Sequence, residues 1–180
     1  MKPDEAKLVE ACIKHNQQAC KQLYDRFAAK MYGVCLRYTR TNSAAEDVLH
    51  DGFVKVFASL HRLRDTDMLE SFIRRIMIFT AINAYNREDP LAQPDTGDDS
   101  ADPAANDELS IYDSIDIDFV MSVVRQLPPR YQVVFNLCVV EDYSYEEVSS
   151  MLGIEQSTVR SNLLRAKRIL ASKLAPYVER

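Results

Sequence analysis

Basic and hydroxyl side chains recur along residues 156–174, near the C-terminal end of the sequence. This stretch holds five Lys or Arg residues and no Asp or Glu. Ammonium and guanidinium groups neutralise phosphates, and a guanidinium can also bond the edge of a guanine through two of its N–H groups. The pattern favours a DNA-binding segment, with an ordinary solvated basic face as the alternative interpretation. The residues predicted to contact DNA are Thr158, Arg160, Ser161, Arg165 and Arg168.

The elements around this segment are those of a helix-turn-helix. Ser144 and Glu147 have the spacing of a capping box, in which each side chain satisfies a free backbone N–H at the start of a helix. Gly153 follows, at a turn whose positive φ is cheap only for glycine. The helix over 156–174 would then lie in the major groove, with its N-terminal residues nearest the bases. The apolar residues spaced to lock the two helices together are Val148, Leu152, Ile154, Val159 and Leu163.

The other residue types that could do chemistry do not form a site. The four cysteines include no C-x-x-C pair, and the three histidines stand apart from them, so neither a zinc site nor a disulfide framework is predicted. No Gly-rich phosphate loop and no nucleophile–base set is visible, which argues against an enzyme on a helical scaffold. We therefore predict no catalytic residue, no metal and no cofactor. The residues interpreted as small buried thiols are Cys12, Cys20, Cys35 and Cys138.

The net charge of -5 is distributed very unevenly along the chain. Residues 1–87 carry 14 Lys/Arg against 10 Asp/Glu, residues 119–180 carry 8 against 6, and residues 88–118 carry 11 acids and no base. Prolines and few large apolar side chains accompany these acids, a composition that cannot bury enough surface to fold. We predict two domains, 1–87 and 116–180, joined by a flexible acidic linker at 88–115.

Four helices are predicted in the first domain, because its apolar residues recur every three to four positions rather than alternately. The longest runs over about 18–40. The third is predicted to begin at a capping box of Ser43 and Glu46, and the fourth near Asp67. Gly52 costs the third helix about 1 kcal/mol relative to alanine; either another helix approaches closely or the glycine is simply tolerated. The apolar residues of the fourth helix are Leu69, Phe72, Ile73, Ile76, Met77, Phe79 and Ile82. With four shorter helices after the linker, the fold class is all-α.

Both domains resemble those of the extracytoplasmic-function sigma factors of bacterial RNA polymerase. The second domain resembles their sigma-four domain. Its matching motifs are Leu127-Pro128-Pro129-Arg130, Tyr145-Glu146-Glu147-Val148, Leu152-Gly153-Ile154, Ser157-Thr158-Val159-Arg160-Ser161 and Leu164-Arg165-Ala166-Lys167. The first domain resembles their sigma-two domain. Its matching motifs are Cys35-x-Arg37, Ala45-Glu46-Asp47-Val48, and Phe72-Ile73-Arg74-Arg75-Ile76 followed by Asn83.

The resemblance implies a sigma factor, which directs core polymerase to specific promoters and helps to melt them. The second domain would bind the upstream, minus-thirty-five element through the predicted residues of 156–174. The third helix of the first domain would bind the polymerase. The residues that match that surface are Glu46, Asp47, His50, Asp51 and Lys55. The fourth helix and the loop before it would capture the minus-ten element. The candidate contacts there are Arg74, Arg75, Asn83, Asn86 and Arg87.

The implied partners are promoter DNA and the beta-prime and beta subunits of RNA polymerase core, and an anti-sigma factor is a further candidate because the family often has one. Phe72 stands where the family usually has tryptophan, which is expected to alter melting while an aromatic ring is kept. Asn162 stands where the family frequently has a basic residue, so promoter affinity is expected to be lower or more dependent on polymerase. The alternative is a stand-alone helix-turn-helix regulator acting as a dimer, although no heptad seam is visible. No stretch approaches the roughly 20 apolar residues that span a bilayer, so we expect a cytoplasmic protein without membrane insertion.

Overall fold

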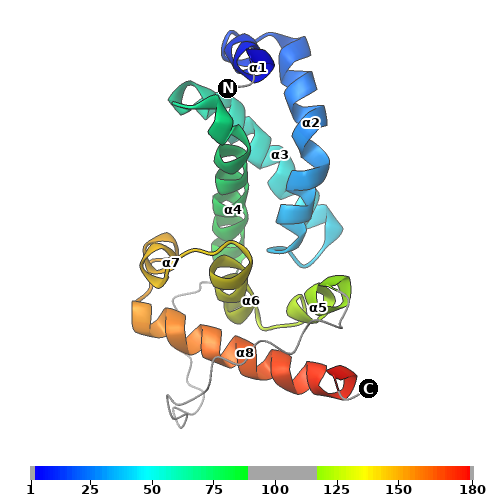
Figure 1. The fold of residues 1–180 in the computed structure, drawn as a ribbon, viewed down its shortest axis with the longest axis vertical. Coiled ribbons are helices and arrows are strands. Elements are labelled where there is room, and N and C mark those ends of the chain that lie inside the picture. Colours follow the sequence, from blue (N-terminus) through cyan, green and yellow to red (C-terminus); the bar gives the residue numbers. More distant parts are fainter. Residues whose placement is uncertain (1–2, 89–116, 179–180) are drawn as a thin grey trace. The chain divides into compact units, whose positions relative to one another are not determined.

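The computed structural model describes residues 3–88 and 117–178, and every regular element in these two ranges is helical (Figure 1). This confirms the predicted all-α fold. The chain divides into two units, Met1–Asp89 and Pro90–Arg180. Apart from Glu88, the predicted acidic linker at 88–115 lies outside the described residues. None of the described helices is both long enough and apolar enough to cross a membrane.

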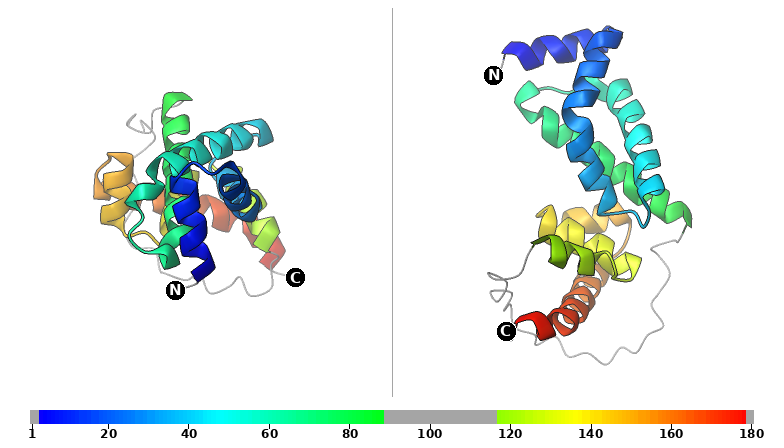
Figure 2. Two further views of the ribbon diagram at one scale, coloured as in Figure 1. Left: turned by 90° about the horizontal axis from the view of Figure 1, so that it is seen from above. Right: turned by 90° about the vertical axis from the view of Figure 1, so that its right-hand side faces the viewer.

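The first unit is built on three long helices and a shorter one. In chain order its described elements are α1 (Pro3–Ile13), α2 (Gln17–Leu36), α3 (Asn42–Ser59), the 3-10 turns η1 (Leu60–Arg62) and η2 (Thr66–Met68), and α4 (Leu69–Glu88). The helices α2, α3 and α4 contact one another, and α1 packs against α2 (Figure 2). Each helix contributes an apolar stripe to one shared core. Large side chains fully buried there include Leu23, Met31, Val56, Leu60, Ile73, Met77 and Ile82.

Thr41 sets the start of α3. Its hydroxyl accepts a hydrogen bond of 3.1 Å from the backbone N–H of Ala44, and its backbone is extended, as an N-cap requires. The helix therefore begins at Asn42. The predicted capping box of Ser43 and Glu46 is wrong, because Ser43 already lies inside the helix.

Two other helix boundaries also differ from prediction. The carboxylate of Asp65 accepts a hydrogen bond of 2.9 Å from the backbone N–H of Asp67 and caps η2, so α4 begins only at Leu69. The helix α2 ends at Leu36, about one turn earlier than its apolar pattern suggested. Boundaries of this kind are decided by which polar side chain reaches a free N–H first, and periodicity does not encode that.

Gly52 marks the close approach of α3 and α4. A Cβ atom added at Gly52 would lie 2.2 Å from Sδ of Met77 and 3.0 Å from its Cε. Met77 belongs to α4 and is fully buried. Close approach, rather than simple tolerance, therefore explains a glycine in the middle of α3.

Alanine substitutions at two helical glycines should change the free energy of unfolding in opposite directions. No atom lies within 4 Å of a Cβ added at Gly33 in α2, so Gly33→Ala should stabilise the fold by up to about 1 kcal/mol through helix propensity. Gly52→Ala displaces the buried Met77 side chain and should destabilise by about 1–3 kcal/mol. Urea unfolding followed by circular dichroism measures both. Equal stabilisation by the two substitutions would contradict the close approach.

The second unit contains the predicted helix-turn-helix. Its described elements are α5 (Ile117–Val124), α6 (Pro129–Phe135), the π-helical turn η3 (Asn136–Val140), α7 (Tyr145–Leu152) and α8 (Gln156–Val178). The helices α5, α6 and α7 all pack against α8, the longest helix of the unit (Figure 1). The arrangement gives α8 one side buried by its neighbours and one side left to solvent.

The turn between α7 and α8 has the predicted features. The backbone N–H of Ser144 donates to the Glu147 carboxylate at 2.9 Å, and the N–H of Glu147 donates to the Ser144 hydroxyl at 3.3 Å, which confirms the capping box. Gly153 ends α7 with a φ of 66°, a left-handed conformation that costs a side-chain-bearing residue about 1–2 kcal/mol. The buried side chains that join the two helices include Val148, Leu152, Val159 and Leu163.

Candidate DNA and protein interfaces

The solvent side of α8 brings four of the five predicted DNA-contacting residues together. Ser161 and Arg168 are exposed, and Thr158 and Arg165 are half-buried. They follow one another at steps of three, four and three residues, a spacing that places them on one stripe of a helix. The opposite, buried side of α8 consists of Val159, Leu163, Ala166, Leu170 and Leu174.

Arg160 lies on the other flank of α8 and is held by α7. Its guanidinium carbon lies 5.5 Å from the ring centroid of Tyr145, a cation–π contact between two exposed side chains. Tyr145 directly follows the N-cap Ser144, so the capping box fixes the helix start that presents the ring. The predicted DNA-contacting residues therefore lie on two flanks of α8, with Arg160 on one flank and Arg165 on the other.

Arg165 is joined to α6 by a residue that the sequence analysis did not identify. Its Nη1 donates a hydrogen bond of 3.4 Å to the hydroxyl of Tyr131. Both side chains are half-buried. The two residues are 34 positions apart in the sequence, so no local pattern could have shown that they meet.

Lys173, Lys167 and Asn162 of α8 lie outside this solvent-side stripe. The Nζ of Lys173 donates a hydrogen bond of 3.2 Å to Oε1 of Gln126. Burial raises the pKa of the Cys138 thiol to about 11, against a smaller lowering by the nearby Lys167 ammonium, which places Lys167 beside η3. Asn162 is only 6% exposed. It therefore lies in the interior and does not take the place of a basic group on the exposed stripe.

One stripe of α4 presents aromatic, basic and amide groups to solvent. Arg75 and Asn83 are exposed, and Phe79 lies half-buried midway between them at steps of four residues. The guanidinium carbon of Arg75 lies 5.7 Å from the ring centroid of Phe79. Phe72 is also half-buried and begins the same stripe. The family's tryptophan position linked Phe72 to melting, but Phe79 was predicted only as one of the apolar residues of this helix.

The remaining residues predicted for the minus-ten element are not all on this stripe. Arg74 precedes Asn83 by nine residues, or two and a half turns, and so lies on the opposite side of α4. Asn86 and Arg87 belong to the last turns of α4, and their side chains lie outside the described residues. Within the described part of the helix, the solvent stripe thus holds Arg75 and Asn83 but not Arg74.

The predicted polymerase-binding residues lie together on α3. The exposed members are Glu46, Asp47, His50, Asp51 and Lys55. Val54, which sequence analysis missed, lies among them and is 68% exposed. A signal was available, since Val54 follows His50 and Asp51 by four and three residues and is out of phase with the buried stripe. Lys55 is directed toward α4, because its Nζ donates a hydrogen bond of 3.2 Å to Oγ1 of the buried Thr80.

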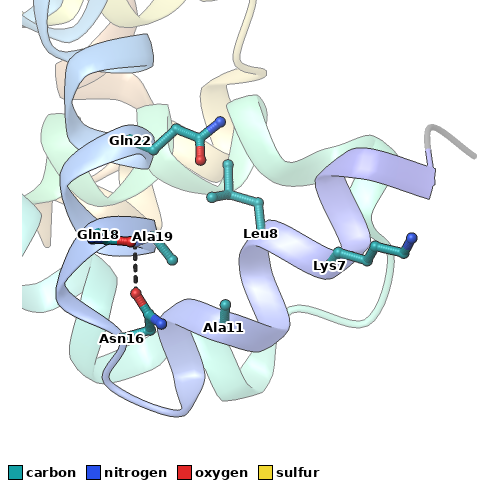
Figure 3. Close-up of a pocket in the computed structure, with 7 residues that line it drawn as sticks. All are labelled: Lys7, Leu8, Ala11, Asn16, Gln18, Ala19 and Gln22. Carbon is teal, nitrogen blue, oxygen red and sulfur yellow. Dashed lines mark hydrogen bonds between the residues drawn. The ribbon is translucent and has the colours of Figure 1, made fainter.

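A shallow hollow between α1 and α2 is distinct from these surfaces (Figure 3). Its volume is about 280 Å³, and it is lined by Lys7, Leu8, Ala11, Asn16, Gln18, Ala19 and Gln22. The Asn16 side-chain oxygen accepts a hydrogen bond of 3.1 Å from the N–H of Ala19 and caps α2 (Figure 3). None of the predicted site residues lines this hollow. Among the residues that the structure describes, no group of three or more His, Cys, Asp or Glu side chains is arranged to hold a metal ion.

Comparison with known proteins identifies the family. The model of sigma-70 region 2 matches residues 23–90, and the model of sigma-70 region 4 matches residues 120–170. Together the two matches cover well over half of the chain. The ECF RNA polymerase sigma-E factor of Haemophilus influenzae is 25% identical over 95% of this chain and 95% of its own length. The chain belongs to the extracytoplasmic-function family of RNA polymerase sigma factors.

Other known proteins are also similar to this chain. The ECF RNA polymerase sigma-E factor of Escherichia coli is 25% identical to this sigma factor and covers 96% of it. Among solved structures, the sigma factor RpoE in complex with the anti-sigma factor NepR from Bartonella quintana has a TM-score of 0.52 at 18% identity, over 86% of this chain and 96% of that one. CnrH in complex with the cytosolic domain of CnrY has a TM-score of 0.49 at 19% identity. The surfaces on α3 and α4 lie within the region 2 match, and α6, α7 and the first four turns of α8 lie within the region 4 match.

Proposed function

We propose that this sigma factor binds core RNA polymerase, directs it to specific promoters and helps to open them for transcription initiation. The observation that carries the proposal is the geometry of α7 and α8: a capped helix-turn-helix presents arginines and hydroxyls on the solvent side of its second helix. The protein acts in the cytoplasm as a specificity subunit and has no catalytic activity of its own.

The helix α8 reads the upstream, minus-thirty-five element. An α-helix of this kind fits the major groove, where arginine can bond guanine through two N–H groups and hydroxyls can bond either base. Arg160 and Arg165 flank the groove-facing side, while Arg168 lies further along α8 and neutralises phosphate. Thr158 and Ser161 lie at the N-terminal end of the helix, which enters the groove most deeply in helix-turn-helix proteins.

The solvent stripe of α4 captures the minus-ten element after strand separation. Unpaired bases stack on aromatic rings, and each stacked base contributes about 1–3 kcal/mol. Phe72 and Phe79 supply the rings, and Arg75 and Asn83 supply the polar contacts beside them. Asn86 and Arg87 extend this set toward the end of α4, and Arg74 contacts the backbone from the other side of the helix.

The exposed surface of α3 binds the β′ subunit of the polymerase. Asp51, Asp47 and Glu46 precede the exposed Val54 by three, seven and eight residues and lie on the same side of α3, toward the start of the helix. An apolar side chain beside charged groups is typical of protein interfaces, because the apolar contact supplies affinity and the charges select the partner. His50 and Lys55 lie on the same surface.

The two DNA-binding domains, 1–87 and 116–180, act together through the linker at 88–115. Residues 88–118 carry 11 acids and no base, so the charge of this segment repels phosphate. Once both domains are held on the β′ and β subunits, each weak promoter contact is strengthened by the high effective concentration of the other. An anti-sigma factor is a candidate partner in the resting state.

Reconstituted transcription tests the proposal directly. Purified core polymerase should co-elute with this chain on gel filtration and, with the chain present, initiate at defined start sites on genomic DNA fragments. Core polymerase alone should give no such starts. A chain that failed to bind core, or that bound promoter duplex tightly by itself as a dimer, would overturn the proposal.

Replacing Arg168 with alanine should weaken promoter binding and flatten its salt dependence. Each phosphate contact releases about one counterion, so the slope of log K against log salt should fall in magnitude by about 1 for Arg168→Ala. Lys173→Ala removes the same charge from the same helix, but Lys173 bonds Gln126 and is directed away from the DNA-facing side. Holoenzyme binding to a promoter fragment at several salt concentrations measures both. Identical slopes for the two variants would contradict the orientation of α8.

A further inference from the structure

We propose that Tyr131 is a positioning residue for promoter recognition, which holds Arg165 in the orientation that reads one base pair of the upstream element. This inference rests on the proposed DNA contact of α8 and adds to it a determinant of specificity outside that helix. Tyr131 lies on α6, and its hydroxyl accepts the hydrogen bond from Nη1 of Arg165 at 3.4 Å.

The surroundings of Tyr131 fix its hydroxyl in place. The next residues of α6, Gln132, Val133 and Val134, are buried and anchor this helix against α8. Tyr131 itself is half-buried, so its ring is supported while its hydroxyl reaches the flank of α8 that carries Arg165. A tyrosine has only two side-chain torsions to order, so it is a rigid support for a flexible arginine.

An arginine side chain loses much rotamer freedom when it binds DNA, and a residue that orders Arg165 beforehand reduces this cost. Ordering a long side chain costs up to about 2 kcal/mol of conformational entropy. A guanidinium has five N–H donors in a planar fork, so the group that bonds Tyr131 can also present N–H groups to a base edge.

Arg160, on the opposite flank, is held differently. Its guanidinium lies over the ring face of Tyr145, so the hydroxyl of that tyrosine is not part of the contact. Arg160 and Arg165 therefore have different supports, a ring face for Arg160 and a hydroxyl for Arg165. Removing the hydroxyl of Tyr131 should affect only the base pair read by Arg165.

The test compares base preference at each position of the upstream element, measured as holoenzyme binding to a promoter library. Tyr131→Phe keeps the ring and removes the hydrogen bond. It should lower base discrimination about fivefold to tenfold at the one base pair where Arg165→Ala also lowers it. Base discrimination at all other positions and the melting temperature of the protein should not change. In the Arg165→Ala background, Tyr131→Phe should have no further effect, since coupled residues are not additive. Tyr177→Phe, an exposed ring further along α8, is the matched control and should leave every position unchanged.

Two outcomes would overturn the role of Tyr131. If Arg165→Ala lowers discrimination but Tyr131→Phe leaves it intact, or lowers binding to all sequences equally, Tyr131 does not position Arg165 for base reading. If Arg165→Ala leaves all preferences intact, the base contact of Arg165 fails, and the role of Tyr131 fails with it. Transcription from the unmutated promoter by the Arg165→Ala holoenzyme shows whether the proposed function survives that second result.

Discussion

Replacing Val54 with glutamate should reduce the affinity of this sigma factor for core polymerase by about a hundredfold at the least. The side chain of Val54 is 68% exposed on α3, and burying a valine in an interface contributes about 1.5 kcal/mol or more. A carboxylate at this position loses that contribution and also has to be desolvated without a partner, which costs several kcal/mol. Each 1.4 kcal/mol corresponds to a factor of ten in Kd.

The control for Val54→Glu is Ile13→Glu in the same unit. Ile13 is 40% exposed at the end of α1, away from the acidic side chains of α3. Both variants add one negative charge and remove one exposed apolar side chain, so they should have similar stability. Titration of fluorescently labelled chain with core polymerase measures the two affinities. If both variants bound core equally well, the assignment of the polymerase interface to α3 would be wrong.

Helix identity and the helix-turn-helix were predictable because their signals are local. The capping box of Ser144 and Glu147 spans a single helical turn, and Gly153 follows where φ must be positive. These features are fixed by neighbours in the sequence and do not depend on the rest of the fold. The start of α3 was not predictable in this way. Thr41 and Ser43 both carry a capping hydroxyl, and only the backbone conformation decides between them.

The composition of the proposed sites was only partly predictable. Thr158, Ser161 and Arg168 share a helix face, and their spacing alone indicates it. Tyr131 approaches Arg165 only through the packing of α6 on α8, which no local pattern encodes. The helix α4 is apolar over much of its circumference, so its pattern could not tell whether Phe79 faces the core or solvent. The packing of α2 and α3 against the other side of α4 makes that choice.

Replacing Phe79 with leucine should slow promoter opening about fivefold to a hundredfold while leaving the binding of core polymerase unchanged. Leucine keeps most of the apolar volume that Phe79 packs into the half-buried side of α4 but offers no flat face to an unpaired base. The loss expected for one stacked base is about 1–3 kcal/mol, which corresponds to that range of rates. Phe72→Leu, on the same stripe, should act in the same direction.

The rate of opening separates this role of Phe79 from a structural one. On a promoter whose minus-ten region is mismatched and already open, strand separation is no longer limiting, and the difference between Phe79→Leu and the unmutated chain should become smaller. A folding defect would persist on both templates. Phe57→Leu is the matched control, because Phe57 is a half-buried aromatic of the same unit whose ring contacts Phe53 on α3 rather than the stripe on α4. Equal opening rates for Phe79→Leu and Phe57→Leu on duplex promoter would show that the α4 stripe does not hold the separated strand.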